Sequence, residues 1–132
     1  NQINLISEIL LENDISGIII SNTSETSREI LKNMQRHQKG GLSGKPIEKK
    51  SNILINKFYN LLKEKIQIIG VGGVDSGKSA YDKFLAGASY IQLYTGMVYQ
   101  GPNVATKIKK ELKELLINKG AKTFKDIIGK KN

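Results

Sequence analysis

The chain has 132 residues, with 21 Lys or Arg against 12 Asp or Glu, a formal net charge of +9. Its length allows one domain at most, and its hydrophobic fraction of 39% and charged fraction of 25% exclude disorder and fibrous repeats. Because the chain has no cysteine, it has no disulfide framework, thiolate metal site or cysteine nucleophile. It also has no apolar run near 18 residues and no signal-peptide pattern, so we expect any membrane attachment outside this chain.

The first predicted elements are a helix and a strand. Apolar residues at helical spacing predict a helix over residues 2–12, which a polar turn ends. Residues 15–22 form a β-branched run bounded by polar residues, which is typical of a strand buried on both faces in a parallel sheet. A polar stretch then leads to three close glycines, where the backbone must turn tightly or lie against a ligand: Gly40, Gly41 and Gly44.

The rest of the chain continues the alternation. The predicted elements are a helix over residues 48–64, a strand over 66–73, a helix over 77–85 capped by Asp75 or Ser76, a strand over 89–94, a helix over 103–118 and a short helix over 123–128. This order predicts an α/β fold of parallel βαβ units with right-handed crossovers. Three strands are few for such a sheet, and a (β/α)8 TIM barrel takes about 250 residues. We therefore expect the C-terminal portion of one, about three βα units without an internal domain boundary, and the lack of an initial methionine agrees.

Small and polar residues follow each predicted strand. They are Ser21-Asn22-Thr23, Gly72-Gly73 and Tyr94-Thr95-Gly96. Ligands of parallel α/β folds lie beyond the carboxyl ends of the strands, so these residues are the site candidates. Glycines expose backbone N–H groups, and a helix that begins just after them adds its positive end. The sequence therefore predicts a phosphate site built by the last two of these segments.

One motif supports a different function. Residues 72–79 fit the P-loop pattern, from Gly72 to Lys78 and Ser79, between a strand and a helix. A nucleotide hydrolase would also need a carboxylate at the end of a neighbouring strand to hold Mg²⁺, and the other two strands end at Asn22 and Tyr94. The P-loop remains an alternative, in which Gly72 to Ser79 bind a nucleotide.

The basic composition supports a second alternative, a nucleic-acid-binding module. Nucleic-acid sites concentrate Arg or interleave Lys with aromatics, whereas these lysines share an amphipathic stretch with glutamates and aromatics are only 6% of the chain. A solvated helix face therefore explains them better. The one histidine, His37, has no companion ligands, so no metal site is expected, and no acid/base pair of carboxylates stands out.

Several ordered motifs together resemble the C-terminal part of the dihydroorotate dehydrogenase family, closest to its membrane-associated, quinone-dependent class. They are Ser21-Asn22-Thr23, the run from Gly40 to Pro46, the run from Ile68 to Gly73, Ala86-Gly87-Ala88, the run from Gln92 to Gly96, and Gly101-Pro102. Several motifs in order at compatible spacing are more specific than any one of them. The resemblance implies an FMN-dependent barrel enzyme of pyrimidine (UMP) synthesis that oxidises dihydroorotate to orotate and reduces a quinone.

The resemblance also implies roles for individual residues. Ser21 stands where the family usually has Thr beside the flavin, and the pyrimidine-binding pair corresponds to Asn22 and Thr23. The expected flavin contacts are Ser43 and Gly44, and the expected FMN phosphate contacts are Gly72, Gly73, Tyr94 and Thr95. An amide such as Asn22 offers both a donor and an acceptor to a planar ring with carbonyl and N–H edges.

What the family needs beyond these residues is expected outside this chain. The resemblance places the catalytic base, a serine in this class, upstream, together with a lysine near the flavin and the helices that receive quinone. We therefore expect no catalytic residue here and no turnover by this segment alone. The partners implied are dihydroorotate or orotate, a quinone and the N-terminal part of the same barrel, without nucleic acid. That part would associate peripherally with a membrane, the cytoplasmic side of a bacterial inner membrane or the mitochondrial inner membrane.

Overall fold

The computed structural model describes residues 2–26 and 28–130. In chain order the elements are α1 (Gln2–Glu12), β1 (Gly17–Ile20), the 3-10 helices η1 (Met34–His37) and η2 (Lys45–Ile47), α2 (Glu48–Leu62), β2 (Gln67–Val71), α3 (Gly77–Leu85), β3 (Tyr90–Gln92), α4 (Thr95–Gln100), α5 (Val104–Asn118) and the 3-10 helix η3 (Phe124–Ile127). Strands and helices alternate through the centre of the chain, as predicted.

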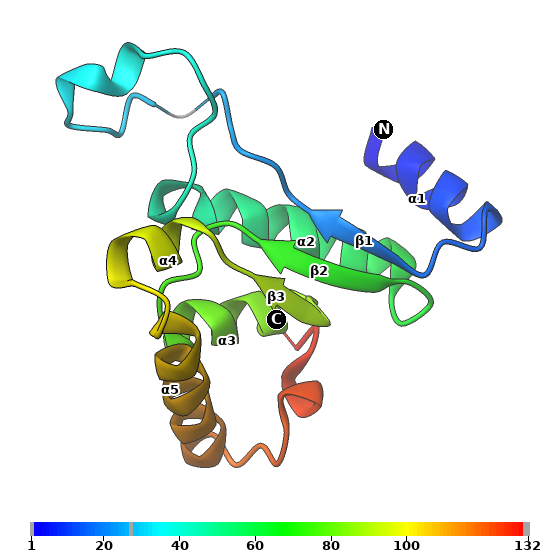
Figure 1. Ribbon diagram of the computed structural model, residues 1–132. Helices are drawn as coiled ribbons and strands as arrows, with labels where there is room; N and C mark the ends of the chain where they lie inside the picture. Colours follow the sequence, from blue (N-terminus) through cyan, green and yellow to red (C-terminus); the bar gives the residue numbers. More distant parts are fainter. Residues whose placement is uncertain (1, 27, 131–132) are drawn as a thin grey trace.

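The three strands form one parallel sheet in the order β1-β2-β3 (Figure 1). Gly17 pairs with Gln67 at the start of the first ladder, and Ile69 pairs with Tyr90 in the second. All three strands therefore end at the same edge of the sheet. Figure 1 shows that the long connection after β1 and helix α4 both lie beyond this edge.

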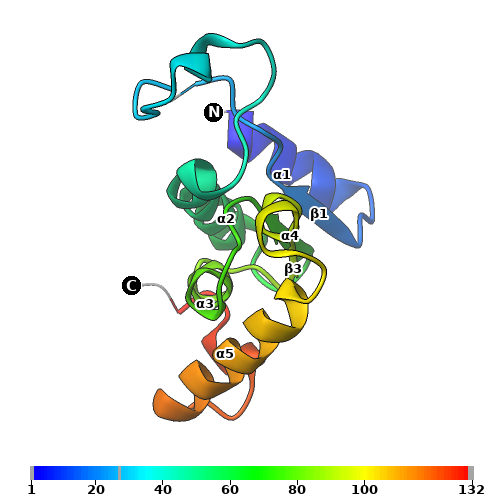
Figure 2. The ribbon, with the colours of Figure 1, turned by 60° about the vertical axis from the view of Figure 1, so that its left-hand side comes forward.

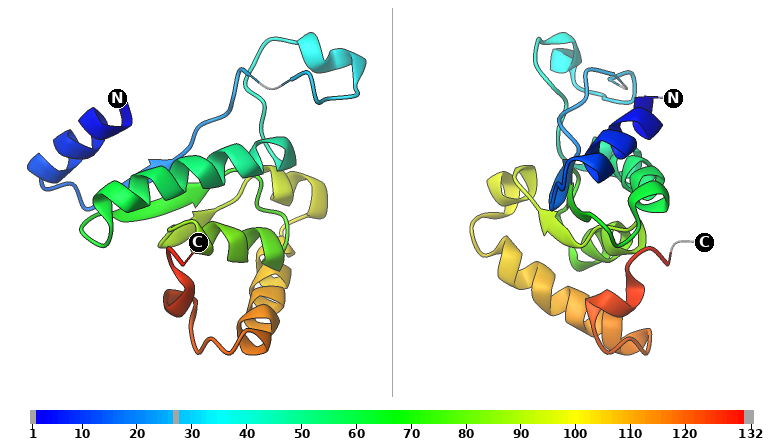
Figure 3. Two further views of the ribbon diagram at one scale, coloured as in Figure 1. Left: turned by 180° about the vertical axis from the view of Figure 1, so that it is seen from behind. Right: turned by 90° about the vertical axis from the view of Figure 1, so that its right-hand side faces the viewer.

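Helices α2 and α3 cover one face of the sheet, as the view from behind shows (Figure 3). Between them and the strands lies an apolar core with exposures of 2% or less at its centre, comprising Ile20, Ile55, Leu62, Ile68, Ala86 and Ala88. Helix α5 packs on the outside of α3, and a Cβ at Gly77 would lie 2.6 Å from the backbone nitrogen of Leu112. Only glycine allows this approach.

Among residues 2–26 and 28–130, no helix lies over the opposite face of the sheet. Side chains alternate along a strand, so the neighbours of buried residues point to this face. Ile19 is 56% exposed and Tyr90 is 53% exposed, whereas Ile20 is 2% exposed. The prediction of strands buried on both faces is thus wrong for this chain taken alone. Ile19 is nevertheless apolar, which suits a position that is shielded from solvent.

Most predicted elements form near their expected bounds, and α3 matches them at both ends. The strands are shorter than predicted, and the terminal helix is a 3-10 helix. Helix α4 was not predicted. It has six residues, Thr95–Gln100, with Gly101 as its C-cap, so it is too short to show a helical period.

Candidate functional site

A pocket with a volume of about 880 Å³ lies at the carboxyl ends of the strands. All nine residues predicted to bind cofactor or substrate line it, from segments that follow β1, precede α2, follow β2 and follow β3: Ser21, Asn22, Thr23, Ser43, Gly44, Gly72, Gly73, Tyr94 and Thr95. The prediction that these segments meet in one pocket is therefore confirmed. The volume falls within the roughly 300–1,000 Å³ of small-molecule sites.

The residues after β1 supply polar side chains to one side of the pocket. The Asn22 side-chain oxygen accepts a hydrogen bond from the Thr23 backbone N–H at 2.7 Å, and the Asn22 side chain is exposed. Thr23 lies so close to Gly41 that a Cβ there would be 1.8 Å from its Oγ1. Gly41 is therefore required for the chain to return beside Thr23, where Ser24 and Leu42 exchange backbone hydrogen bonds of 2.9 and 2.7 Å.

The loop before α2 contacts the segment after β3. Gly44 has a φ of 75°, and a Cβ on it would lie 2.8 Å from Thr95 Cγ2. Thr95 Oγ1 donates a hydrogen bond of 3.0 Å to Ser43 Oγ. Residues 43 and 44 are thus joined to residue 95 by packing and by a hydrogen bond, although 52 positions separate the bonded pair in the chain.

The glycine turn, defined as Gly72 and Gly73, has positive φ values of 106° and 78°. It lies against the start of α2, because a Cβ on Gly73 would be 2.4 Å from Glu48 Cβ and 2.7 Å from its Cα. Among residues 2–26 and 28–130, the backbone N–H groups of Gly73 and Thr95 have no acceptor. Two donors that line the pocket are therefore available to a ligand.

At the N-terminus of α3, the backbone N–H groups of Gly77 and Ser79 already have hydrogen-bond acceptors. This corrects the prediction that the start of this helix helps to bind a phosphate. Ser76 Oγ accepts from the backbone N–H of Ser79 at 3.2 Å, and the Gly77 N–H donates to Glu111 Oε2 at 2.6 Å. A carboxylate from α5 thus holds the place of an anion at this helix. The amides of the glycine turn and of the segment after β3 remain as the candidate phosphate donors.

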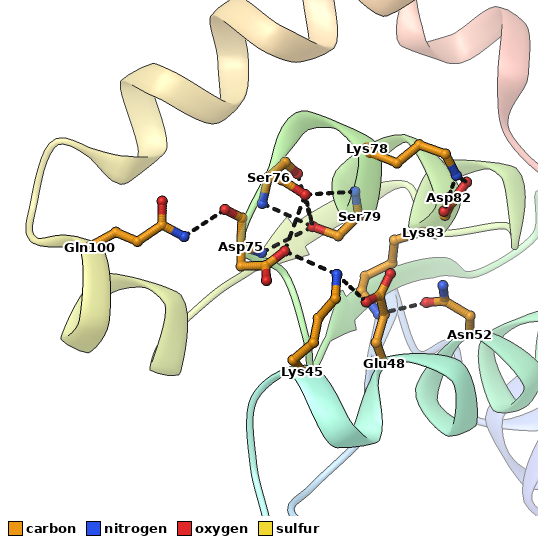
Figure 4. Close-up of polar contacts among 10 residues, drawn as sticks. All are labelled: Lys45, Glu48, Asn52, Asp75, Ser76, Lys78, Ser79, Asp82, Lys83 and Gln100. Carbon is orange, nitrogen blue, oxygen red and sulfur yellow. Dashed lines mark hydrogen bonds and ion pairs between the residues drawn. The ribbon is translucent and has the colours of Figure 1, made fainter.

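The same contacts weigh against the P-loop alternative (Figure 4). Lys78 lies on the exposed side of α3 and forms an ion pair with Asp82. Ser79 Oγ accepts hydrogen bonds of 3.0 Å from the backbone N–H groups of Asp75 and Ser76. In a P-loop the lysine and the following hydroxyl would face the nucleotide phosphates and Mg²⁺. Here the lysine pairs with a carboxylate on the outer surface of α3, and the hydroxyl caps the start of the same helix.

Lys45 and Asp75 form a charged pair at the edge of the pocket that the sequence reasoning missed. Lys45 Nζ lies 2.6 Å from Glu48 Oε2 and 3.2 Å from Asp75 Oδ1 (Figure 4). The hydrogen bond with Glu48, together with that of Asp75, raises the pKa of Lys45 against partial burial. Burial opposes ionisation of Asp75, but hydrogen bonds from Lys45 and Ser76 outweigh it and lower its pKa. In the sequence, the position of Lys45 between Gly44 and Pro46 was the signal that could have identified it.

Helix α4 adds two further lining residues, Tyr99 and Gln100. Gln100 Nε2 donates to the backbone oxygen of Asp75 at 2.7 Å, so the helix is tied to the loop after β2. Sequence reasoning missed both residues because it missed the helix. The glycine at position 101 was the signal in the sequence that a helix could end there, and in the structure it has a φ of 80°.

The remaining predictions concern sites outside the pocket. His37 lies in η1, within a segment that stands apart from the sheet and its helices (Figure 2). No group of three or more His, Cys, Asp or Glu suited to a metal occurs among the residues that the structure describes. In the same part of the chain, none of the helices combines the length and apolarity needed to cross a bilayer. The α5 lysines are exposed, with Lys107 Nζ 3.8 Å from Glu111 Oε1.

The family model for dihydroorotate dehydrogenase matches residues 1–116 of this chain. The mitochondrial dihydroorotate dehydrogenase (quinone) of Mus musculus is 44% identical over 124 residues, which cover 94% of this chain and 31% of that protein. The dihydroorotate dehydrogenase (quinone) of Bartonella henselae is 39% identical over 120 residues, covering 91% and 33%. The chain spans about a third of the length of the curated relatives it matches.

Solved structures give the same result. The crystal structure of ligand-free DHODH from Eimeria tenella superimposes with a TM-score of 0.94 at 35% identity, over 98% of this chain and 36% of that one. The complex of Eimeria tenella DHODH with ferulenol gives a TM-score of 0.93 at 35% identity, over 98% and 34%. These matches confirm the predicted fold class, a portion of a TIM barrel. By its sequence and its fold, the chain belongs to the dihydroorotate dehydrogenase family.

Proposed function

We propose that the protein containing this chain is a flavin-dependent dihydroorotate dehydrogenase. It oxidises dihydroorotate to orotate in de novo pyrimidine synthesis, with a quinone as electron acceptor, and this chain supplies part of the FMN and orotate site. One observation carries the proposal: four separate segments bring all nine residues expected from the family into a single pocket. Family membership supplies the reaction, and the relatives, which are quinone-type dihydroorotate dehydrogenases, supply the electron acceptor.

The donors around the glycine turn fit the phosphate of FMN. The free N–H groups of Gly73 and Thr95 suit a dianion, which binds backbone amides without needing a cation at each oxygen. Gly72 and Tyr94 stand beside them on the same pocket. Lys45 contributes a positive charge to the pocket lining, although Glu48 and Asp75 already neutralise it. Binding by backbone amides therefore explains why this site needs glycine rather than a cluster of lysines.

The polar side chains after β1 fit the other end of the site. Asn22 and Thr23 would bind the pyrimidine, because an amide and a hydroxyl can pair with both its carbonyl and its N–H edges. Ser21, Ser43 and Gly44 would contact the flavin ring between the two ends. FMN, when bound, supplies the hydride acceptor that no amino-acid side chain provides. The role of this chain is then to bind both molecules and orient the reacting carbon of the substrate toward the ring.

The catalytic base, the quinone site and the membrane contact belong in our proposal to parts of the protein outside this chain. The open face of the sheet, with Ile19 and Tyr90 exposed, suits cover by further strands of the barrel. The mitochondrial relative and the bacterial relatives support association with an inner membrane. Alone, this segment would then bind flavin weakly and would not turn over.

The proposal is tested on the purified full-length protein. We expect visible flavin absorbance, which falls when dihydroorotate is added without oxygen and returns when a quinone is added. Protein without flavin that instead takes up ATP with Mg²⁺ would contradict the proposal and revive the P-loop. Binding to DNA or RNA that weakens steeply with salt would favour the nucleic-acid alternative.

A further inference from the structure

A lysine with a fully buried side chain lies between α2 and α3. Lys83 has 0% exposure, and its Nζ donates to Asn52 Oδ1 at 2.7 Å (Figure 4). The same Nζ donates to Ser51 Oγ at 3.1 Å. Both acceptors are neutral and almost fully buried, with exposures of 4% and 2%. Burying an ammonium group costs free energy, and such a lysine is rare without a carboxylate that pairs with it. A role beyond packing would explain its position.

Ser51 links Lys83 to the glycine turn. Its Oγ donates a hydrogen bond of 2.6 Å to the backbone oxygen of Val71, the last residue of β2. A serine hydroxyl has one proton, so with that proton on Val71 it accepts from Lys83. The oxygen of Val71 belongs to the peptide bond that leads into Gly72. This relay of two hydrogen bonds therefore fixes the orientation of the peptide plane from which the turn begins.

The sequence of β2 leaves room for this arrangement. A Cβ on Gly70 would lie 2.8 Å from both Cγ and Cδ of Lys83 and 3.0 Å from Ala88 Cβ. A Cβ on Gly72 would lie 3.4 Å from Ser51 Cβ. Glycine at position 70 thus makes space for the aliphatic part of the lysine. At position 72 the positive φ of 106° favours glycine, and the turn lies in van der Waals contact with Ser51, the residue that Lys83 holds. Gly70 does not line the pocket, so ligand contact does not explain it.

Near neutral pH, Lys83 is mostly in its charged ammonium form. Burial lowers its pKa to about 8, and attraction to Glu48 on α2 opposes that shift. On α3 the neighbouring Asp82 is paired with Lys78, and β2 contributes no titratable group to its Gln67–Val71 span. Most molecules therefore carry the ammonium form at pH 7, with three protons to donate.

We propose that Lys83 is a positioning residue for phosphate recognition: through Ser51 and the Val71 carbonyl it holds the glycine turn so that the Gly73 N–H points at the phosphate of the flavin. The inference rests on the proposed function and deepens it. Lys83 does not line the pocket, so it acts on the phosphate only through the turn. Removing the relay should weaken binding of the phosphate end and leave the ring end intact.

The test compares FMN with riboflavin, which lacks the phosphate, on flavin-free full-length protein. Lys83→Met keeps the aliphatic length and removes the donors, and Ser51→Ala breaks the relay at its centre. We expect each variant to lose about tenfold of the preference for FMN over riboflavin, with riboflavin affinity changed less than twofold. A tenfold loss corresponds to about 1.4 kcal/mol. Lys78→Met, on the exposed side of the same helix, is the matched control and should keep the preference.

The double variant K83M/S51A should lose no more preference than the larger single loss, because both substitutions break one relay. An unchanged preference in both single variants would overturn the role of Lys83, and so would an equal loss of affinity for both flavins, which indicates general destabilisation. If Lys83→Met does not fold, Ser51→Ala decides by the same criteria. A wild-type protein that binds neither flavin would instead overturn the proposed function, before any variant is made.

Discussion

The pocket has two unlike sides. The glycine turn forms one side and packs on the core, where it contacts Glu48 of α2. Ser51, which accepts a hydrogen bond from Lys83, donates one to the carbonyl that precedes the turn. On the other side, residues 21–26 and 28–44 run outward from the end of β1 and return just before η2. The first side offers backbone N–H groups, and the second offers side chains.

Several hydrogen bonds join residues 21–26 and 28–44 of this connection to one another. Ser24 and Leu42 pair through their backbones, and Arg28 donates to the carbonyls of Gln38 and Gly40. Lys50 of α2 provides an exposed tie to it. A group common to many cofactors, a phosphate, would thus meet rigid backbone, whereas the substrate would meet side chains on a loop. Substitution on the loop side can change specificity without disturbing the core.

The largest effect is expected at the rigid side, from Gly73→Val in the full-length protein. Valine would have to adopt a φ near 78° and place its Cβ within 3 Å of the Glu48 backbone. The added side chain would therefore press against the start of α2. Strain and overpacking together cost about 3 kcal/mol or more, so we expect FMN affinity to fall by over a hundredfold. Flavin absorbance per protein after dialysis measures this.

Gly120→Val is the matched control for that variant. Gly120 also has a positive φ, 71°, but a Cβ there meets nothing within 4 Å. It carries the same kind of backbone strain without the contact and lies away from the pocket. Full flavin occupancy in both variants would count against the phosphate assignment of Gly73.

The loop side is expected to show a smaller effect on a different measurement. Asn22→Ala removes an amide that can pair with the pyrimidine, which costs about 1–3 kcal/mol. We expect kcat/KM for dihydroorotate to fall roughly tenfold to a hundredfold, with the flavin content unchanged. Steady-state kinetics and the absorbance spectrum of the same preparation separate the two readouts. Asn13→Ala, in the turn between α1 and β1 and away from the pocket, is the control. Unchanged kinetics in Asn22→Ala would remove it from the substrate site.

The meeting of these segments in one pocket could be predicted in outline. The glycines after β2 and the polar residues after β1 could be placed in one pocket because parallel strands end at one edge. Helix α3 could be bounded closely because Ser76 signals its start and Gly87 its end. Such signals are local, and so they can be read from the chain itself.

What supports the rigid side could not be predicted. Lys83 looks like a surface lysine in the sequence, because a charge on an amphipathic helix is normally solvated. Its partners Ser51 and Asn52 lie 32 and 31 positions away, and no local signal joins them. The same holds for Glu111, whose carboxylate takes the place at α3 that the sequence suggested for a phosphate. These contacts depend on how helices pack, which local patterns do not specify.

The pH dependence of stability tests the burial of Lys83. Its folded-state pKa of about 8 is below the ordinary 10.5, so between these values the unfolded chain binds more protons than the folded one. Stability therefore rises with pH across this window. We expect the unfolding free energy of wild type minus that of Lys83→Met to increase by about 1 kcal/mol between pH 7 and pH 9. Chemical denaturation at both pH values measures it, and a difference that stays constant or falls would show that Lys83 is not desolvated.

The smallest effect is expected where the loop side is tied to α2. Lys50 Nζ donates to Ser24 Oγ at 2.9 Å and to Thr26 Oγ1 at 2.6 Å, but these groups are exposed, and such contacts contribute about 0.5 kcal/mol or less. Lys50→Met should therefore increase the rate of tryptic cleavage at Arg36 by no more than about twofold, because cleavage follows the population of the open loop. Lys49→Met, on the exposed surface of the same turn of α2, should leave the rate unchanged. An increase of tenfold or more would mean that Lys50 supports the loop as strongly as Lys83 is proposed to support the glycine turn, and the contrast between the two sides would then be wrong.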